Sequence, residues 1–299
     1  MYCWGDDMTD WAAPDAYAFK GTAAAKAARA EAAKESKAKG GRTYEKRSAP
    51  LLDLTTPRKT LRTKSANPIV VAVDVTGSMQ RWPFEIFDRL PLLYQTLSQY
   101  REDVEVSFVA LGDATSDRFP LQVTDFRRGL PLEETLGALY GEGGGGGGAR
   151  ESYELLAYQL LYRCQAPEAT RPFLILYGDE GFYPTLEPKL AKAMWGDTID
   201  EPLDSRRLWQ GVAEGWNVFH LRKPYGGHQE ASIHAQWAEA LGEERIVLLD
   251  DVQRAVDVAL GIVARQWGHF GDFEQNLAAR QAPDVVARVA DRVERVVLR

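Results

Sequence analysis

The sequence predicts an α/β protein with a doubly wound, mostly parallel central sheet and helices on both faces. Two unbroken apolar runs, 69–73 and 173–177, lead directly into Asp74 and into Gly178-Asp179. Runs of this kind are typical of central strands that are buried on both faces. Segments with helical length and spacing separate these runs from further strand-like segments. Such alternation favours a parallel sheet covered by helices on each side.

The other elements follow from the same alternation along the chain. A helix is expected over 83–100, where Pro83 suits the first turn because that turn needs no amide donor. Further strands are expected at 104–111, 120–126, 216–221 and 245–249. Further helices are expected at 132–140, 151–163, 204–214, 231–241 and 252–266.

Three regions are expected along the chain. Residues 1–67 form an N-terminal extension, with an Ala/Lys-rich helix or disorder at 21–39 and a basic linker after it, because this composition offers little to bury. Residues 68–266 form the α/β domain, and residues 267–299 form a C-terminal helical extension. The valines of 282–298 recur at helical spacing. That pattern favours a helix docked on its own domain, with a partner-binding surface as the alternative.

Charge is distributed unevenly. The net charge is −7, yet residues 20–65 hold 13 Lys/Arg against 4 Asp/Glu. The remainder of the chain is therefore acidic, which argues against nucleic-acid binding by the globular part. The basic arm at 20–65 is either a solvated tail or a contact for nucleic acid or an acidic partner.

Composition also bounds the location of the protein. No apolar run approaches the length that crosses a bilayer, and the N-terminal residues lack the layout of a signal peptide. The two cysteines, Cys3 and Cys164, exclude a disulfide scaffold and a cysteine-based zinc site. We expect a cytoplasmic protein that does not enter a membrane.

Oxygen-bearing side chains follow the two central strands. Asp74, Thr76 and Ser78 alternate around a turn that Gly77 permits, so their oxygens are able to converge on a hard cation such as Mg²⁺. Asp179 follows the second central strand, and the carboxyl ends of parallel strands meet at one edge of a sheet. The alternative is that these residues are turn and helix-cap residues.

Two further acidic residues and a glycine run are expected at the same edge of the sheet. Glu180 and Asp113 are expected to be solvated or capping residues rather than ligands. The six-glycine run before Ala149 is not followed by Gly-Lys-Ser/Thr, so it is not a Walker A phosphate loop.

The Asp74-x-Thr76-x-Ser78 pattern resembles the metal-ion-dependent adhesion site (MIDAS) of von Willebrand factor A (VWA) domains, whose motif is usually DxSxS. The resemblance spans about 68–266 and implies a Rossmann-like VWA fold. It also implies a ligand from the loop that enters the next major helix. Where the family commonly has Thr, this chain has Glu151, as in the integrin β version. Ser152 is the second candidate for that position.

The resemblance implies a last ligand at Asp179, acting through water. The chain is also similar to bacterial intracellular A-domain proteins at 73–79, 120–123, 151–154 and 178–183. Such proteins are often associated with AAA+ ATPases of the MoxR type or with stress and defence systems. The resemblance therefore implies a metal-dependent adaptor and a class of partner.

A non-enzymatic binding module is the function expected from the sequence. Mg²⁺ or Mn²⁺ would be held by Asp74, Thr76, Ser78, Glu151 and Asp179, and a partner's Asp or Glu would fill the open coordination position. One alternative is a metal-dependent phosphohydrolase, which the chain disfavours because position 76 carries Thr rather than a second Asp. The other is a structural subunit of a larger assembly whose metal site is vestigial.

Overall fold

A six-stranded sheet forms the centre of the protein. The structure is a computed structural model that describes residues 49–129, 131–144 and 148–296. The strands lie in the order β12-β11-β7-β2-β3-β4, and all are parallel except β4, which runs antiparallel to β3. Their bounds are β2 (Pro68–Asp74), β3 (Glu105–Leu111), β4 (Leu121–Val123), β7 (Phe173–Gly178), β11 (Asn217–Arg222) and β12 (Ile246–Leu248). The expected α/β class and mostly parallel sheet are confirmed.

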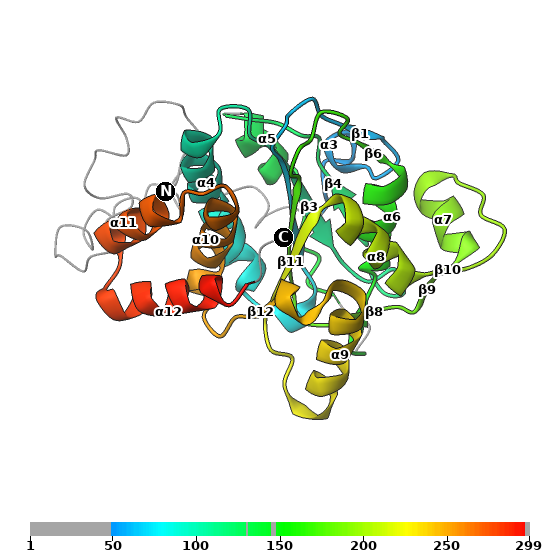
Figure 1. Ribbon diagram of the computed structural model, residues 1–299. Helices are drawn as coiled ribbons and strands as arrows, with labels where there is room; N and C mark the ends of the chain where they lie inside the picture. The colour runs from blue at the N-terminus through cyan, green and yellow to red at the C-terminus, as the bar shows by residue number, and fades with distance from the viewer. Residues whose placement is uncertain (1–48, 130, 145–147, 297–299) are drawn as a thin grey trace.

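Helices cover both faces of this sheet (Figure 1). One face carries α4 (Trp82–Tyr100), α5 (Pro131–Gly137), α10 (Ala255–Gln266), α11 (Phe270–Arg280) and α12 (Pro283–Glu294). The other carries α6 (Glu154–Tyr162), α7 (Pro188–Trp195), α8 (Ser205–Gly215) and α9 (Glu230–Leu241). Strand β2 divides its side chains between the two cores, with Val71 in one and Val70 in the other. This is why the run at 69–73 is apolar without alternation.

Short elements complete the chain. They are α3 (Leu52–Thr55), β1 (Leu61–Arg62) paired with β6 (Cys164–Gln165), β5 (Arg150–Glu151) paired with β8 (Gly181–Phe182), β9 (Thr185–Leu186) paired with β10 (Leu203–Asp204), and the 3₁₀ turns Gly77–Met79, Gly227–Gln229, Glu243–Arg245 and Val252–Arg254. The β1–β6 pairing attaches the segment that precedes β2 to the domain. The expectation of helix or disorder at 21–39 lies outside the described residues.

Two expectations for local structure need correction. The helix expected at 151–163 begins only at Glu154, because residues 150–151 pair with β8 and the Ser152 amide donates to the Gly112 carbonyl. Helices α7 and α11 were not expected individually. Each buries only two or three of its side chains.

The C-terminal helices share the core of the sheet domain. Val289 and Val293 of α12 are fully buried in the same cluster as α10, so the expected docking of the valine-bearing helix is confirmed. Gly261 of α10 allows this close packing, since a Cβ there would lie 2.6 Å from a methyl carbon of Val293.

Among the described helices, none has the length and hydropathy needed to span a membrane.

A core substitution in α11 tests whether the C-terminal helices are an integral part of the domain. Leu277 is fully buried, so Leu277→Ala is expected to lower the free energy of unfolding by about 2–5 kcal/mol in chemical denaturation. The exposed Gln275→Ala on the same helix is the control and is expected to change it by less than about 0.5 kcal/mol. Equal, small effects of both substitutions would show that α11 contributes nothing to the core.

Candidate functional site

The two strands that lie side by side in the middle of the sheet end at acidic residues. Strand β2 ends at Asp74, and β7 leads directly into Asp179. The strands are parallel and in register, with Val73 opposite Tyr177, so both carboxylates lie at the same edge. Both side chains are buried, with exposed fractions of 0% and 1%. The structure thus brings together two of the residues that the sequence placed in one site.

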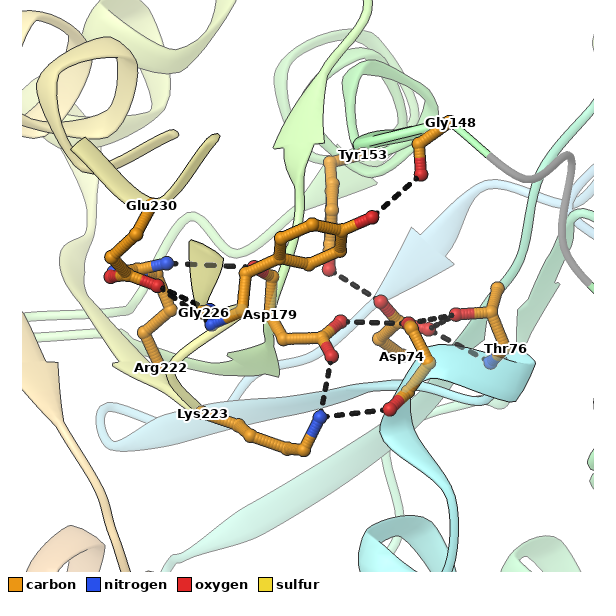
Figure 2. Close-up of polar contacts among 11 residues, drawn as sticks. Asp74, Thr76, Gly148, Tyr153, Asp179, Arg222, Lys223, Gly226 and Glu230 are labelled. Atoms are coloured by element: carbon orange, nitrogen blue, oxygen red, sulfur yellow. Dashed lines mark hydrogen bonds and ion pairs between the residues drawn. The ribbon is translucent and has the colours of Figure 1, made fainter. Parts of the chain in front are cut away.

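Hydroxyl groups connect these two carboxylates. The Thr76 amide and hydroxyl both donate to Asp74 Oδ1, at 2.8 and 2.6 Å (Figure 2). Thr76 Oγ1 lies 3.2 Å from Ser78 Oγ, which donates to Asp179 Oδ1 at 2.9 Å. Each hydroxyl thus donates its hydrogen to a carboxylate, and the four candidate ligands from two loops converge in one group, which we call the edge cluster (Asp74, Thr76, Ser78 and Asp179).

The start of the glycine run packs against the loop of the edge cluster. The Gly77 amide donates to the Gly144 carbonyl at 2.5 Å, and the Gly143 amide donates to the Val75 carbonyl at 3.0 Å. A Cβ at Gly77 would lie 3.1 Å from the carbonyl oxygens of both Gly143 and Gly144. Glycine at position 77 therefore permits a close approach of two backbones. Residues 145–147 of the run lie outside the described residues.

Tyr153 belongs to the site and was missed from the sequence. Its hydroxyl donates to Asp74 Oδ2 at 2.5 Å, so both oxygens of this carboxylate have partners (Figure 2). A Cβ at Gly178 would lie 2.2 Å from the Tyr153 hydroxyl. Gly178 thus leaves the space that the tyrosine occupies. The glycine at the end of a buried strand was the one sequence signal of this approach.

Lys223 is the second residue that sequence analysis missed. It follows β11, the strand next to β7, and its amide donates to the Gly178 carbonyl at 2.9 Å. Its ammonium group donates to Asp179 Oδ2 and to the Ser78 carbonyl, both at 2.8 Å (Figure 2). The side chain thereby places a positive charge directly on the edge cluster.

Two glutamates lie near the edge cluster and are also buried. Glu151 and Glu180 are 2% and 3% exposed, and the Oε2 atom of each has no hydrogen-bond partner among the described residues. Burial and then the charge of Asp74 raise the pKa of the Glu151 carboxyl, so Glu151 interacts with the edge cluster electrostatically. The expectation that Glu180 is solvated was wrong, because the loop after β7 is covered by α9, whose Trp237 indole donates to the Glu180 carbonyl at 2.8 Å.

Burial and mutual repulsion raise the pKa values of these acids. Burial, followed by the charge of Asp179, raises the pKa of Asp74 to about 7. Burial, followed by the charge of Asp74, raises the pKa of Glu151 to about 10. For Glu180, burial and then the charges of Asp179 and Asp74 raise the pKa to about 8, while a hydrogen bond from Ser78 opposes the rise. A cation at this edge would stabilise the ionised forms.

Ser152 and Asp113 have structural contacts. Ser152 Oγ accepts from the Ala114 amide at 2.9 Å and lies 3.4 Å from Asp113 Oδ1. Asp113 caps its own loop, accepting from the Thr115 amide at 3.0 Å and from the Thr115 hydroxyl at 2.5 Å. The capping role expected for Asp113 is confirmed, although the residue is fully buried rather than solvated.

The side chains of the edge cluster determine which atoms would have to bind a metal ion. Within residues 49–129, 131–144 and 148–296, no three His, Cys, Asp or Glu side chains are arranged to hold a metal ion. A cation at the edge cluster would therefore depend on the Thr76 and Ser78 hydroxyls together with the two aspartates. These are the hard oxygen donors that Mg²⁺ prefers, so the donor set fits such an ion.

The chain is structurally similar to two solved proteins at low sequence identity. No protein-family model and no curated protein matches the chain. Among solved structures, proximal thread matrix protein 1 from the mussel byssus is similar at 10% identity and a TM-score of 0.48, covering 71% of this chain and 49% of that one. The pilus adhesin SpaC from Lactobacillus rhamnosus GG is similar at 12% identity and a TM-score of 0.47, covering 70% and 31%. The chain thus spans about half and about a third of these two proteins, and likeness at this level carries no functional argument.

The raised pKa values predict how stability depends on pH in the absence of divalent metal. Between pH 5 and 8, Asp74 and Glu180 bind protons in the folded protein that the unfolded chain has already released, because their unfolded values are 3.8 and 4.5. The free energy of unfolding in EDTA is therefore expected to fall as pH rises through this range, by on the order of 5 kcal/mol.

Denaturation at several pH values measures this slope. Glu180→Gln removes one of the titrating groups, so its slope is expected to be shallower than that of the wild type. The exposed Glu201→Gln is the matched control and is expected to leave the slope unchanged. A stability that rises with pH in the wild type would contradict the assigned directions.

Proposed function

We propose that this chain is a VWA-type protein whose doubly wound, Rossmann-like sheet carries a MIDAS at the edge cluster and uses it to bind another protein. In this proposal Asp74, Thr76 and Ser78 hold Mg²⁺ or Mn²⁺, and Asp179 acts through water. The observation that carries the proposal is the convergence of two carboxylates and two hydroxyls: Thr76 donates to Asp74 Oδ1, Ser78 donates to Asp179 Oδ1, and the two hydroxyl oxygens lie 3.2 Å apart. If these residues served only as turn or helix caps, each would hydrogen-bond within its own loop. Instead, Ser78 of the loop after β2 donates to Asp179 of the loop after β7.

The surrounding acids support a cation at this position. Glu151 Oε2 and Glu180 Oε2 are buried acceptors without partners among the described residues, and burial of such groups without compensation is costly. A divalent ion would offset the charge that raises the pKa of Asp74 and Glu151. Glu151 is the proposed fifth ligand because it is buried and the charge of Asp74 raises its pKa; its carboxylate would have to move to join the site, since no three acidic side chains of the described residues are arranged for a metal.

The bound ion would supply one open coordination position with high affinity for a carboxylate oxygen. We therefore infer that the ligand is an Asp or Glu side chain of a partner protein and that the chain acts as an adaptor rather than an enzyme. The partner class proposed from the sequence resemblance is a MoxR-type AAA+ ATPase or a component of a bacterial stress or defence system.

One observation favours a second candidate function. The Lys223 ammonium already neutralises Asp179 and occupies one of its oxygens. Because Lys223 already supplies a positive charge to Asp179, the site would be stable without a metal ion. This would suit a structural subunit of a larger assembly in which the metal site is vestigial. Metal titration separates the two candidates, because the structural alternative predicts no binding.

Calorimetric titration with Mg²⁺ and Mn²⁺ is the direct test of the metal site. The wild type is expected to bind one ion. Asp74→Asn is isosteric and keeps an acceptor for Thr76, but it removes the ligand charge, so it is expected to weaken binding by about 100-fold or more. The exposed Glu201→Gln, outside the edge cluster, is the control and is expected to leave the binding of the ion unchanged. Tight metal binding by Asp74→Asn would refute the site.

Capture from a native extract tests the binding function. A partner is expected to remain on the immobilised wild type in Mg²⁺ and to be lost in EDTA, because the ion would form the bond to its carboxylate. The same partner is expected to be absent from immobilised Asp74→Asn in Mg²⁺, and quantitative mass spectrometry measures all three samples. Proteins retained equally under all three conditions would argue against metal-dependent recognition.

A further inference from the structure

Lys223 lies within hydrogen-bonding distance of two groups that define the edge cluster. Its ammonium donates to Asp179 Oδ2 and to the Ser78 carbonyl, each at 2.8 Å. The side chain is only 18% exposed, and Asp179 is 1% exposed. This ion pair therefore belongs to the interior of the edge rather than to the solvated surface.

The backbone position of Lys223 is set by the sheet. Strand β11 lies next to β7, with Arg222 opposite Gly178, and the Lys223 amide continues that pairing by donating to the Gly178 carbonyl. The lysine side chain then reaches across Asp179 to the loop after β2. A fixed backbone and two short contacts make the ammonium a tethered cation at the edge cluster.

The acids around this ammonium explain what it does in the absence of metal. Asp74 and Asp179 belong to the edge cluster, and the charge of each raises the pKa of Glu180. The Lys223 ammonium pairs with Asp179 and so reduces the repulsion among these carboxylates.

We propose that Lys223 is a built-in competitor of the divalent ion, which leaves Asp179 when the metal binds. The inference rests on the proposed metal site. A divalent ion held by Asp74, Thr76 and Ser78 and linked to Asp179 through water would meet an ammonium already bound to Oδ2 of that carboxylate, and two cations that share one carboxylate repel each other. Lys223 therefore sets the metal affinity of the site, and occupancy of the site controls whether its amine is free.

A different role for Lys223 makes the opposite prediction. If the lysine served only to orient Asp179 as a metal ligand, its removal would loosen Asp179 and weaken metal binding. The direction of the affinity change therefore distinguishes competition from positioning.

Calorimetry with Mn²⁺ on the full chain measures this direction. Lys223→Met removes the charge and keeps most of the aliphatic length, and it is expected to bind Mn²⁺ at least about tenfold more tightly than the wild type. Lys223→Arg keeps the charge and is expected to remain close to the wild type. Equal or weaker binding by Lys223→Met would overturn the inference. Binding by Lys223→Met but not by the wild type would support it in its strongest form.

Amine labelling of the wild type adds a readout that needs no folded variant. Lys223 is expected to react slowly with an acylating reagent in EDTA and several-fold faster in saturating Mn²⁺, as followed by peptide mass spectrometry. The exposed Lys189 and Lys192 of α7 serve as internal references whose rates are expected to stay constant. An unchanged or slower rate at Lys223 in Mn²⁺ would overturn displacement.

The two proposals fail in different ways. If neither the wild type nor Lys223→Met binds Mn²⁺, the metal site itself is absent and both proposals are refuted. If the wild type binds Mn²⁺ and Lys223→Met binds no more tightly, the metal site stands and the competitor role of Lys223 is refuted.

Discussion

The parallel pairing of β2 with β7 is the constraint on which the rest of the site depends. Register between these strands, with Val73 opposite Tyr177, carries Asp74 and Asp179 to the same edge and buries both. Two carboxylates at such a position repel each other and lose hydration, so the surrounding structure must supply donors. The Thr76 and Ser78 hydroxyls, the Tyr153 phenol and the Lys223 ammonium do so, and they reach the edge from three separate parts of the chain.

Glycine makes this concentration of polar groups sterically possible. At Gly178 a side chain would collide with the Tyr153 hydroxyl, and at Gly77 it would press on the carbonyls of the glycine run. Both positions therefore serve close packing between segments that are far apart in sequence. The hydrogen bond from Tyr153 to Asp74 spans 79 residues, which shows that the site is held by tertiary contacts rather than by one motif.

The balance of charge at the edge links the stability of the protein to the proposed metal site. Repulsion and burial leave Glu151 and Glu180 with raised pKa values and with one carboxylate oxygen each that has no partner among the described residues. A single ammonium offsets part of that charge at Asp179. An edge with this composition costs stability as the acids ionise, and a divalent ion would recover it. The excess of acidic side chains over the single ammonium would therefore favour cation binding at this edge, and the stability of the protein would depend on which cation is bound.

The sequence by itself determined the fold class and the identity of the loops that matter. The runs at 69–73 and 173–177 consist of apolar and aromatic residues, and this predicts strands that are buried on both faces. The sequence also places Asp74, Thr76, Ser78 and Asp179 in one candidate site, because they come directly after those strands. Only the tertiary structure decided that Tyr153 and Lys223 complete the site and that Glu151 precedes its helix. Their contacts depend on the order of strands in the sheet, and no local pattern of residues encodes that order.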